Sequence, residues 1–264
     1  MQLYRKITIA AIAILFCTTA IMATDNMEIN EKALQGKKVL YVYGGWDGHQ
    51  PEQCRDIFVP WLRSEGAEVL EFNQFTCYED SALMASVGLI IQHYTQGTIS
   101  DSQERGLLNA VKRGVGLAGW HGGIGDSFRS NTDFQYMVGG QWVSHPGGII
   151  SYTVNITDKE DPVTKGLQDF DMKSEQYFMH VDPNIKVLAT TTFSREPDRW
   201  IEGAVIPVVW KKQYGKGRVF YSSLGHAASD FNVPEALEIM KRGIRWAAES
   251  LEKGPEKWLS PIYK

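Results

Sequence analysis

One stretch, Val115–Gly123 (VGLAGWHGG), constrains the fold of this chain more than any other. Its small and apolar residues predict a buried strand of an α/β sheet, and its glycines predict a tight turn, because glycine lets the backbone bend sharply and pack closely. A polar residue with glycines two before and two after it has the spacing of a nucleophile elbow. Hydrolytic elbows carry serine or cysteine at the tip, whereas this one carries His121.

The N-terminal half alternates strands and helices. Continuous apolar runs predict strands at 39–43, 67–72 and 87–91, ahead of the strand of the elbow. Helices are predicted between them at 51–65, 81–85 and 100–112. Ser100 with Gln103 forms a capping box for the last of these helices, and Gly114 ends it. This order predicts an α/β fold with a doubly wound, mostly parallel sheet and helices on both faces.

The C-terminal half is less regular. A helix is predicted at 127–137, a glycine-rich loop at 139–148 and a final helix at 234–251. Strands are predicted at 149–157, 187–193, 207–210 and 218–222, the last two as a hairpin. With neither an internal repeat nor a linker, we expect one domain at 36–250 and a C-terminal tail at 251–264.

The first 23 residues have the pattern of a secretory signal peptide. Arg5 and Lys6 precede an apolar run, and small residues lead to Ala20 and Ala23. An uncleaved anchor is the alternative, although the run is short for a membrane span. We therefore expect residues 1–23 to be removed and the mature chain to be periplasmic or extracellular.

Composition narrows the classes of partner. The formal net charge is −4 over 264 residues, which argues against nucleic acid or a membrane surface as the main partner. A small molecule is the expected ligand, and the oligomeric state stays open. Beyond the signal peptide only Cys54 and Cys77 remain, either as one disulfide or as two unpaired thiols.

Histidines follow several predicted strands. In an open α/β sheet the carboxyl ends of the strands meet at the crevice where ligands bind, so these side chains are expected to converge. The four that follow strands are His49, His93, His121 and His226. His145 and His180, from the less regular half, are candidates to reach the same crevice.

Three chemistries suit such a cluster. A Cys-His-Glu glutaminase needs a thiolate on the elbow, and His121 stands there instead. A divalent metal, either zinc, nickel or iron, suits neutral imidazoles with one carboxylate. The predicted metal ligands are His49, His93, His121 and His226. Metal-free acid–base chemistry would instead use His121, His226 and Glu175 as catalytic residues, and these two alternatives stay open.

Aromatic and polar residues beside the histidines indicate the kind of ligand. Flat aromatic faces flanked by polar groups suit sugar rings, although any single tryptophan can equally belong to the core. The predicted substrate-binding residues are Trp46, Asp47, Arg55, Tyr94, Trp120, Trp142, His145 and His180. Asp126 and Gln141 are further candidates to bind hydroxyl groups.

Five segments in order resemble the ThuA-like (trehalose utilisation) family of the class I glutamine amidotransferase-like superfamily. They are GGWDGHQPEQCR (44–55), GLAGWHGG (116–123), GGQWVSHPGG (139–148), SEQYFMH (174–180) and PVVWKKQYGKGRVFYSSLGH (207–226). The resemblance extends over residues 37–249. It implies a flavodoxin-like α/β sandwich and a role in the metabolism of disaccharides or keto-sugars.

The chain departs from the amidotransferase pattern at two catalytic positions. His121 replaces the nucleophile, and Ala228 stands where the relatives carry the acid of the triad, so glutaminase activity is not expected. Two classes remain. One is an enzyme acting on a glycoside or keto-sugar as a hydrolase, lyase or isomerase; the other is a non-catalytic sugar-binding protein. We favour the enzyme, because binding proteins of this kind need two lobes and the chain has room for one.

Overall fold

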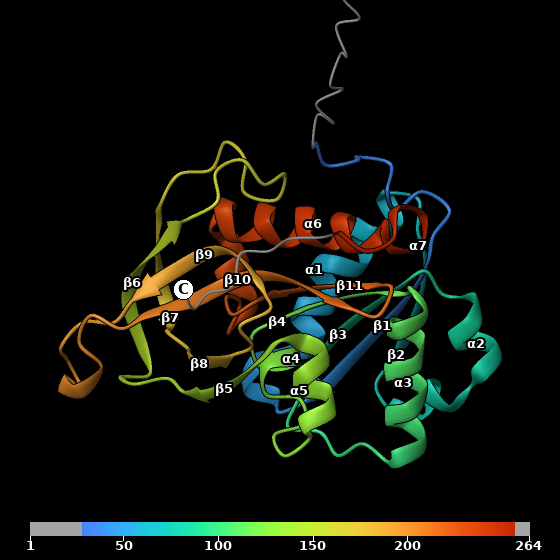
Figure 1. Ribbon diagram of the computed structural model, residues 1–264, viewed down its shortest axis with the longest axis horizontal. Coiled ribbons are helices and arrows are strands. Elements are labelled where there is room, and N and C mark those ends of the chain that lie inside the picture. Colours follow the sequence, from blue (N-terminus) through green and yellow to red (C-terminus); the bar gives the residue numbers. More distant parts are fainter. Residues whose placement is uncertain (1–27, 257–264) are drawn as a thin grey trace, which may run out of the picture.

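The computed structural model describes residues 28–256 (Figure 1). The predicted signal peptide and the last part of the predicted tail lie outside the described residues. Within them, the main feature is a nine-stranded sheet with the order β2-β1-β3-β4-β11-β10-β9-β6-β7. A separate two-stranded sheet pairs β5 with β8.

The first five strands in this order are parallel neighbours. They are β2 (Glu68–Phe72), β1 (Lys38–Gly45), β3 (Leu89–Thr95), β4 (Gly116–Trp120) and β11 (Gly217–Ser222). Because parallel strands end at the same edge, the loops that follow β1, β3, β4 and β11 come together there. The prediction of a flavodoxin-like, mostly parallel sheet is confirmed.

The remaining strands of the large sheet are antiparallel. They are β10 (Val205–Tyr214), β9 (Lys186–Thr192), β6 (Ile149–Ile156) and β7 (Phe170–Glu175). The predicted hairpin is confirmed as β10 and β11, joined by a tight turn. In Figure 1 this antiparallel region extends to the left of the parallel strands.

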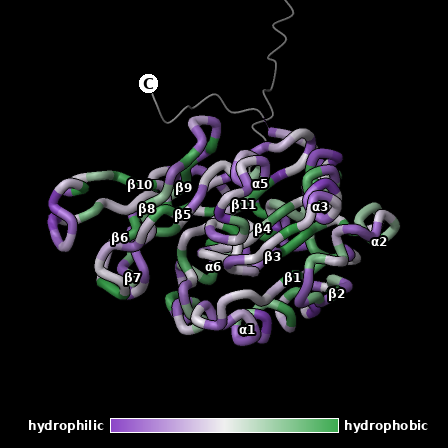
Figure 2. The backbone as a smooth tube through the Cα atoms, turned by 90° about the horizontal axis from the view of Figure 1, so that it is seen from below, coloured by the Kyte–Doolittle hydropathy of each residue, from purple (hydrophilic) through white to green (hydrophobic). Residues whose placement is uncertain are grey.

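Helices cover both faces of the parallel region. One hydrophobic cluster includes α1 (Pro51–Ser64) and α6 (Pro234–Ala248). The other includes α2 (Ser81–Ser86), α3 (Asp101–Arg113) and α5 (Thr132–Val138). Figure 2 shows the strands between them as largely hydrophobic and the loops as largely hydrophilic. The short α4 (Gly122–Gly125) and α7 (Ser250–Lys253), with 3-10 helices η1 (Asp47–His49), η2 (Phe75–Glu79), η3 (Arg199–Ile201) and η4 (Ala228–Asn232), complete the described elements.

The segment predicted as a glycine-rich loop at 139–148 is partly a strand, so that prediction was wrong. β5 (Gly140–Ser144) pairs antiparallel with β8 (Phe178–Val181). Glycine is required at 140 because a Cβ there would lie 2.9 Å from both the His180 carbonyl oxygen and the Trp210 ring. Glycine at this position therefore reflects close packing between the sheets, not a loop.

The prediction of a helix at 127–137 is also wrong in its extent. The chain forms α4 and α5 with a connection at 126–131 between them. Asn131 begins α5, because its side-chain oxygen accepts a hydrogen bond from the Phe134 amide at 2.8 Å. Likewise, the final helix ends at Ala248, and α7 follows as a separate turn. The capping box of Ser100 and Gln103 is confirmed in α3.

β3 is longer than the sequence predicts. Gly44 and Gly45 extend β1, and they pair with Tyr94 and Thr95. A Cβ on Gly45 would lie 1.9 Å from the Thr95 carbonyl oxygen, so the extra pairing depends on glycine. As a result His93, expected after the strand, lies within it.

Both remaining cysteines are free thiols. Cys54 is a buried residue of α1, and Cys77 is buried in η2. Burial raises the pKa of each thiol to about 12. Of the two alternatives, the unpaired thiols are therefore the correct one. Among residues 28–256, no helix has the length and apolar character needed to cross a membrane.

Candidate functional site

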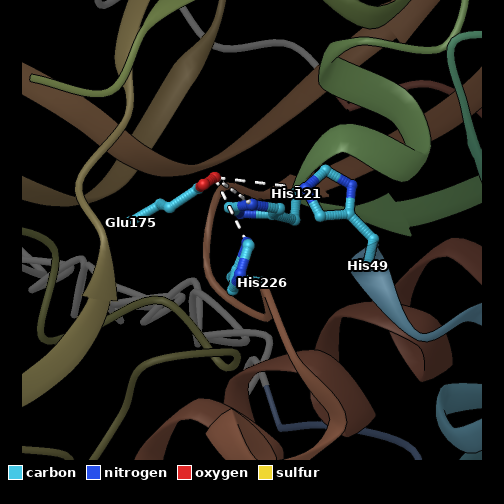
Figure 3. Close-up of side chains that lie close together, drawn as sticks. All are labelled: His49, His121, Glu175 and His226. Atoms are coloured by element: carbon cyan, nitrogen blue, oxygen red, sulfur yellow. Dashed lines mark hydrogen bonds and ion pairs between the residues drawn. The ribbon is translucent and has the colours of Figure 1, made fainter. Parts of the chain in front are cut away.

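Four side chains from four separate segments converge at the edge where the parallel strands end (Figure 3). They are His49, His121, Glu175 and His226. One nitrogen or oxygen atom of each lies within 4.8 Å of the corresponding atoms of the others. We call this group the His3Glu cluster. Three imidazoles and one carboxylate form a set that could hold a metal ion.

His121 occupies the tip of the predicted elbow. It follows β4 with φ 46° and ψ −138°, a backbone conformation that residues other than glycine rarely adopt. The glycines after it allow close approach. A Cβ on Gly122 would lie 2.4 Å from His49, and one on Gly123 would lie 2.3 Å from His93. The elbow thus carries His121 into the centre of the cluster.

The orientation of the His121 ring is fixed by a backbone carbonyl. Nδ1 lies 2.8 Å from the Ser223 carbonyl oxygen, which can only accept, so Nδ1 donates. In the neutral ring, Nε2 therefore carries a lone pair. That lone pair points at Glu175 Oε2, 3.1 Å away. Two acceptors face each other here, and the arrangement requires a cation between them, either a proton or a metal.

The two oxygens of Glu175 have different neighbours. Oε2 lies 3.1 Å from His121 Nε2, 3.2 Å from His226 Nδ1 and 4.0 Å from His49 Nε2. Oε1 faces His145, whose Nδ1 is 3.7 Å away. The predicted approach of His145 to the crevice is therefore correct in its geometry. One oxygen belongs to the His3Glu cluster, and the other faces a partly exposed imidazole.

Burial and the neighbouring groups set the charges of the cluster. Burial, with a smaller contribution from the adjacent His121, lowers the pKa of His49 to about 2. Burial also lowers the pKa of His121, although the adjacent Glu175 opposes this shift. Burial alone would raise the pKa of Glu175, but the adjacent His121 and His226 outweigh it and hold that pKa well below its ordinary value. Neutral imidazoles with an ionised carboxylate are the protonation states that metal ligands need.

A second layer of hydrogen bonds holds the cluster in place. His49 Nδ1 lies 2.8 Å from Thr95 Oγ1 at the end of β3. Asp230 in η4 accepts from the backbone amide of His226 at 2.9 Å and from Ser174 Oγ at 2.6 Å. Asp230 thereby joins the loop of His226 to the strand of Glu175. The sequence analysis missed Asp230; the only available signal was a carboxylate four residues after His226.

His93, predicted as a metal ligand, does not join the cluster. It is 1% exposed, and its Nε2 donates to the His49 carbonyl oxygen at 3.2 Å. Its ring stacks on Trp120 at 4.5 Å. Burial lowers its pKa to about 4. The reason is its position inside β3, which directs the ring into the core, where it supports the backbone of η1.

The predicted aromatic residues have different environments. Trp46 is 47% exposed, and its ring centroid lies 4.7 Å from that of His49, edge to face. Trp142 lies 5.7 Å from the His145 ring. Trp120 is fully buried against Phe58 and Phe231, so the prediction that it contacts a sugar ring is corrected. Tyr94 packs on Phe75 at 4.3 Å.

The other predicted binding residues are not brought to the cluster. Arg55 on α1 pairs with Asp56 and Glu71 and donates to Tyr43. Asp126 pairs with Arg129. No interaction links the His3Glu cluster to Asp47 in η1, to Gln141 on β5 or to His180 on β8 within residues 28–256.

Tyr177 is a second residue that the sequence analysis missed. It is 3% exposed, and its ring stacks on His121 with centroids 3.9 Å apart. It lies two residues after Glu175, in the connection between β7 and β8. Its ring therefore covers one face of the imidazole at the elbow.

The fold and the cluster define a flavodoxin-like α/β protein with a set of side chains at its strand edge that could hold a metal ion. The family model for trehalose utilisation (ThuA) matches residues 38–247, and the chain belongs to this family. The match lies within the domain expected at 36–250. Family membership supports a carbohydrate-related role with a small-molecule ligand.

Solved structures share the fold. A ThuA-like protein from Bacteroides uniformis ATCC 8492 has a TM-score of 0.68 at 18% identity, over 80% of this chain and 91% of that one. A ThuA-like protein from Parabacteroides merdae ATCC 43184 has a TM-score of 0.64 at 19% identity, over 85% and 93%. A cytoplasmic protein from Salmonella typhimurium LT2 has a TM-score of 0.57 at 14% identity, over 83% and 100%. No protein of curated function matches the chain.

Proposed function

We propose that this protein is a metal-dependent enzyme that processes a glycoside or keto-sugar at the His3Glu cluster. The observation that carries the proposal is the lone pair of His121 Nε2, held by Ser223 so that it faces the Glu175 carboxylate. His226 and His49 direct nitrogens at the same carboxylate oxygen. The lowered pKa values of His49, His121 and Glu175 leave two neutral imidazoles beside an ionised carboxylate, and these are the protonation states in which such groups bind a divalent cation.

The donor set favours zinc, nickel or iron. Three imidazole nitrogens and one carboxylate oxygen are ligands that these metals share. Such a metal supplies Lewis acidity, which polarises a bound oxygen or acidifies a bound water. The residues that would hold it are His49, His121, Glu175 and His226. His121 is oriented by the Ser223 carbonyl and His49 by Thr95, so little reorganisation is needed on binding.

The residues around the cluster support a sugar as the substrate. Trp46 offers a half-exposed aromatic face beside His49 and lies 6.4 Å from the His226 ring. The side chain of His145 is 39% exposed, and an imidazole suits a hydrogen bond to a hydroxyl group. The family assignment supports carbohydrate chemistry. The reaction is of the hydrolase, lyase or isomerase type.

Glutaminase activity is not part of the proposal. Glutamine hydrolysis on this fold needs a reactive thiolate, whereas both cysteines are buried and their pKa values are raised to about 12. Ala228 offers no carboxylate after His226. We expect ammonia release from glutamine to stay at background.

The test is metal analysis of the purified protein together with an activity screen. After exposure to Zn²⁺, Ni²⁺ or Fe²⁺, the protein should retain about one metal ion by elemental analysis. Chelation should abolish turnover of a hit from a panel of native and 3-keto disaccharides, and one of the three metals should restore it. A protein that retains no metal and whose activity ignores chelation would support imidazole acid–base chemistry instead. A metal-loaded protein that binds but converts no sugar would support the non-catalytic alternative.

Export is a separate proposal, supported by the pattern of residues 1–23. Intact-mass analysis of protein recovered outside the cytoplasm should give a chain that begins near Thr24. Retention of Met1 in that fraction would contradict cleavage.

A further inference from the structure

A cavity of about 440 Å³ lies outside the His3Glu cluster. Residues 96–99, which follow β3, and residues 128–131, which connect α4 to α5, line it. In Figure 1 both segments lie at the lower edge of the molecule. The volume is within the range of about 300–1,000 Å³ that small-molecule sites occupy.

The walls of the cavity are firmly built. The backbone N–H of Gln96 donates to the backbone carbonyl of Asp126 at 2.9 Å. The backbone N–H of Gly97 donates to the backbone carbonyl of Ser127 at 2.6 Å. The buried Ser127 hydroxyl joins the same region to the Tyr94 and Gly123 carbonyls. Gln96 has φ 58°, a conformation uncommon outside glycine and often retained at ligand sites.

The cavity lining carries no net charge, because its one charged side chain is paired. Arg129 forms two hydrogen bonds to Asp126, using Nε and Nη2, so its charge is neutralised. Asn131 uses its oxygen to cap α5, which leaves its amide nitrogen to donate. Thr98 and Ser130 add hydroxyls. A neutral, polyhydroxylated ligand fits this lining better than an anion, because no unpaired positive charge is present in it.

A line of planar side chains connects the cavity to the cluster. The Arg129 guanidinium lies 4.6 Å from the Trp142 ring. Trp142 lies 5.7 Å from the His145 ring, and His145 Nδ1 lies 3.7 Å from Glu175. Planar side chains suit a second sugar ring lying along this path.

We propose that this cavity is a second carbohydrate subsite, which binds the ring of an oligosaccharide remote from the ring at the His3Glu cluster. The proposal rests on the proposed function, since it assumes that a sugar occupies the cluster. Binding of a remote ring supplies energy that positions the reacting ring. The substrate class that follows is a neutral di- or oligosaccharide, not a free monosaccharide.

The test is a substitution at the exposed rim that fills the cavity with a larger side chain. In the full chain loaded with zinc, Ser130→Tyr should weaken binding of at least one of trehalose, maltose and cellobiose tenfold or more, measured by calorimetry. Binding of methyl α-glucoside and the zinc content should not change. Asn131→Asp keeps the oxygen that caps α5 and removes the amide donor, so a smaller loss in the same direction is expected. The matched control is Ser102→Tyr, on the rim of a separate cavity beside α2 and α3.

The outcomes separate this proposal from the proposed function. If the wild-type protein loads zinc but Ser130→Tyr binds every disaccharide as the wild type does, the subsite is overturned and the metal site stands. The subsite is equally overturned if no disaccharide binds more tightly than methyl α-glucoside. If zinc is never retained but disaccharide binding still depends on Ser130, the metal proposal fails and the subsite stands.

Discussion

The parallel and antiparallel regions of the sheet contribute different parts of the site. The parallel region supplies the three imidazoles, since His49, His121 and His226 follow β1, β4 and β11. The antiparallel region supplies Glu175 at the end of β7, and His145 follows β5 of the separate two-stranded sheet. The cluster therefore lies where the two regions meet. The geometry of the cluster depends on how firmly the region that carries Glu175 is held against the region that carries the three histidines.

The two regions are also stabilised differently. Parallel strands β1, β3 and β4 are buried largely through apolar side chains. In the antiparallel region, Lys211 on β10 is fully buried, and both Asp161 oxygens lie within 2.8 Å of its Nζ. Lys186 on β9 binds the same carboxylate at 2.7 Å. Burial lowers the pKa of Lys211 in spite of Asp161, so the pair compensates a desolvation cost and adds little net stability.

The largest predicted effect follows from removal of the Asp161 carboxylate. Asp161→Asn leaves the Lys211 ammonium buried without a counter-charge and should lower the free energy of unfolding by about 3–5 kcal/mol. Chemical denaturation at neutral pH measures it, with Glu160→Gln, an exposed neighbour, as the control. An effect no larger than that of the control would show that β10 tolerates an unpaired Lys211.

The pairing of Asp161 with Lys211 also predicts how this loss of unfolding free energy depends on pH. Burial would raise the pKa of Asp161, but Lys211 and Lys186 outweigh burial and hold that pKa below its ordinary value. A carboxyl with a lowered pKa stabilises the fold above its unfolded-state pKa of about 3.9, and this stabilisation is lost as pH falls through the folded-state pKa. The difference between wild type and Asp161→Asn should therefore shrink in acid. A difference that grows in acid would contradict the pairing.

The second prediction tests the histidine side of the cluster. His121→Asn keeps a residue that tolerates positive φ but removes the Nε2 lone pair that faces Glu175. Turnover should fall by about 10²-fold or more, the scale for a group that acts on the reacting atoms, and the metal content should fall with it. His180→Asn, at an exposed position of β8, is the control. Unchanged metal content and turnover would remove His121 from the site.

The third prediction tests the junction between the two regions. Asp230→Ala removes the acceptor shared by the His226 amide and Ser174, and metal affinity should fall by about 10- to 100-fold, as for other residues that orient ligands. Asp230→Asn keeps one acceptor oxygen and should restore part of the affinity. Metal titration measures both variants, with the exposed Asp171→Ala on β7 as the control. Equal losses of thermal stability in both variants with unchanged metal affinity would give Asp230 a structural role only.

The parallel region was predictable because its signals are local. Apolar runs, the Ser100 capping box and the glycines around His121 each report on a few neighbouring residues, and the structure agrees with them. In the separate two-stranded sheet, by contrast, β5 depends on Gly140 packing against Trp210, 70 residues later in the sequence. No local pattern reports such a contact, so 139–148 reads as a loop.

The candidate site was predictable in its residue types but not in their orientations. His121, His226 and Glu175 come together as expected, and His49 joins them. His93 and Trp120 also stand near strand ends, but their side chains stack on each other in the core. A position near a strand end does not say to which side a ring points. Asp230 and Tyr177 were missed because they act through contacts with Ser174, His226 and His121 that only the folded chain brings together.

The smallest predicted effect concerns Trp46, at the end of the parallel region that faces solvent. Because its half-exposed ring lies beside His49 and forms no part of the donor set, Trp46→Ala should raise KM with little change in kcat. Stacking on a sugar ring is worth on the order of 1 kcal/mol, so a rise of about fivefold is expected. Trp200→Ala is the matched control, since Trp200 is 81% exposed in η3, between β9 and β10. If kcat falls while KM stays constant, Trp46 instead orients the reacting group. If both tryptophan variants match the wild type, the substrate contacts the Glu175 side of the cluster, through His145 and Trp142.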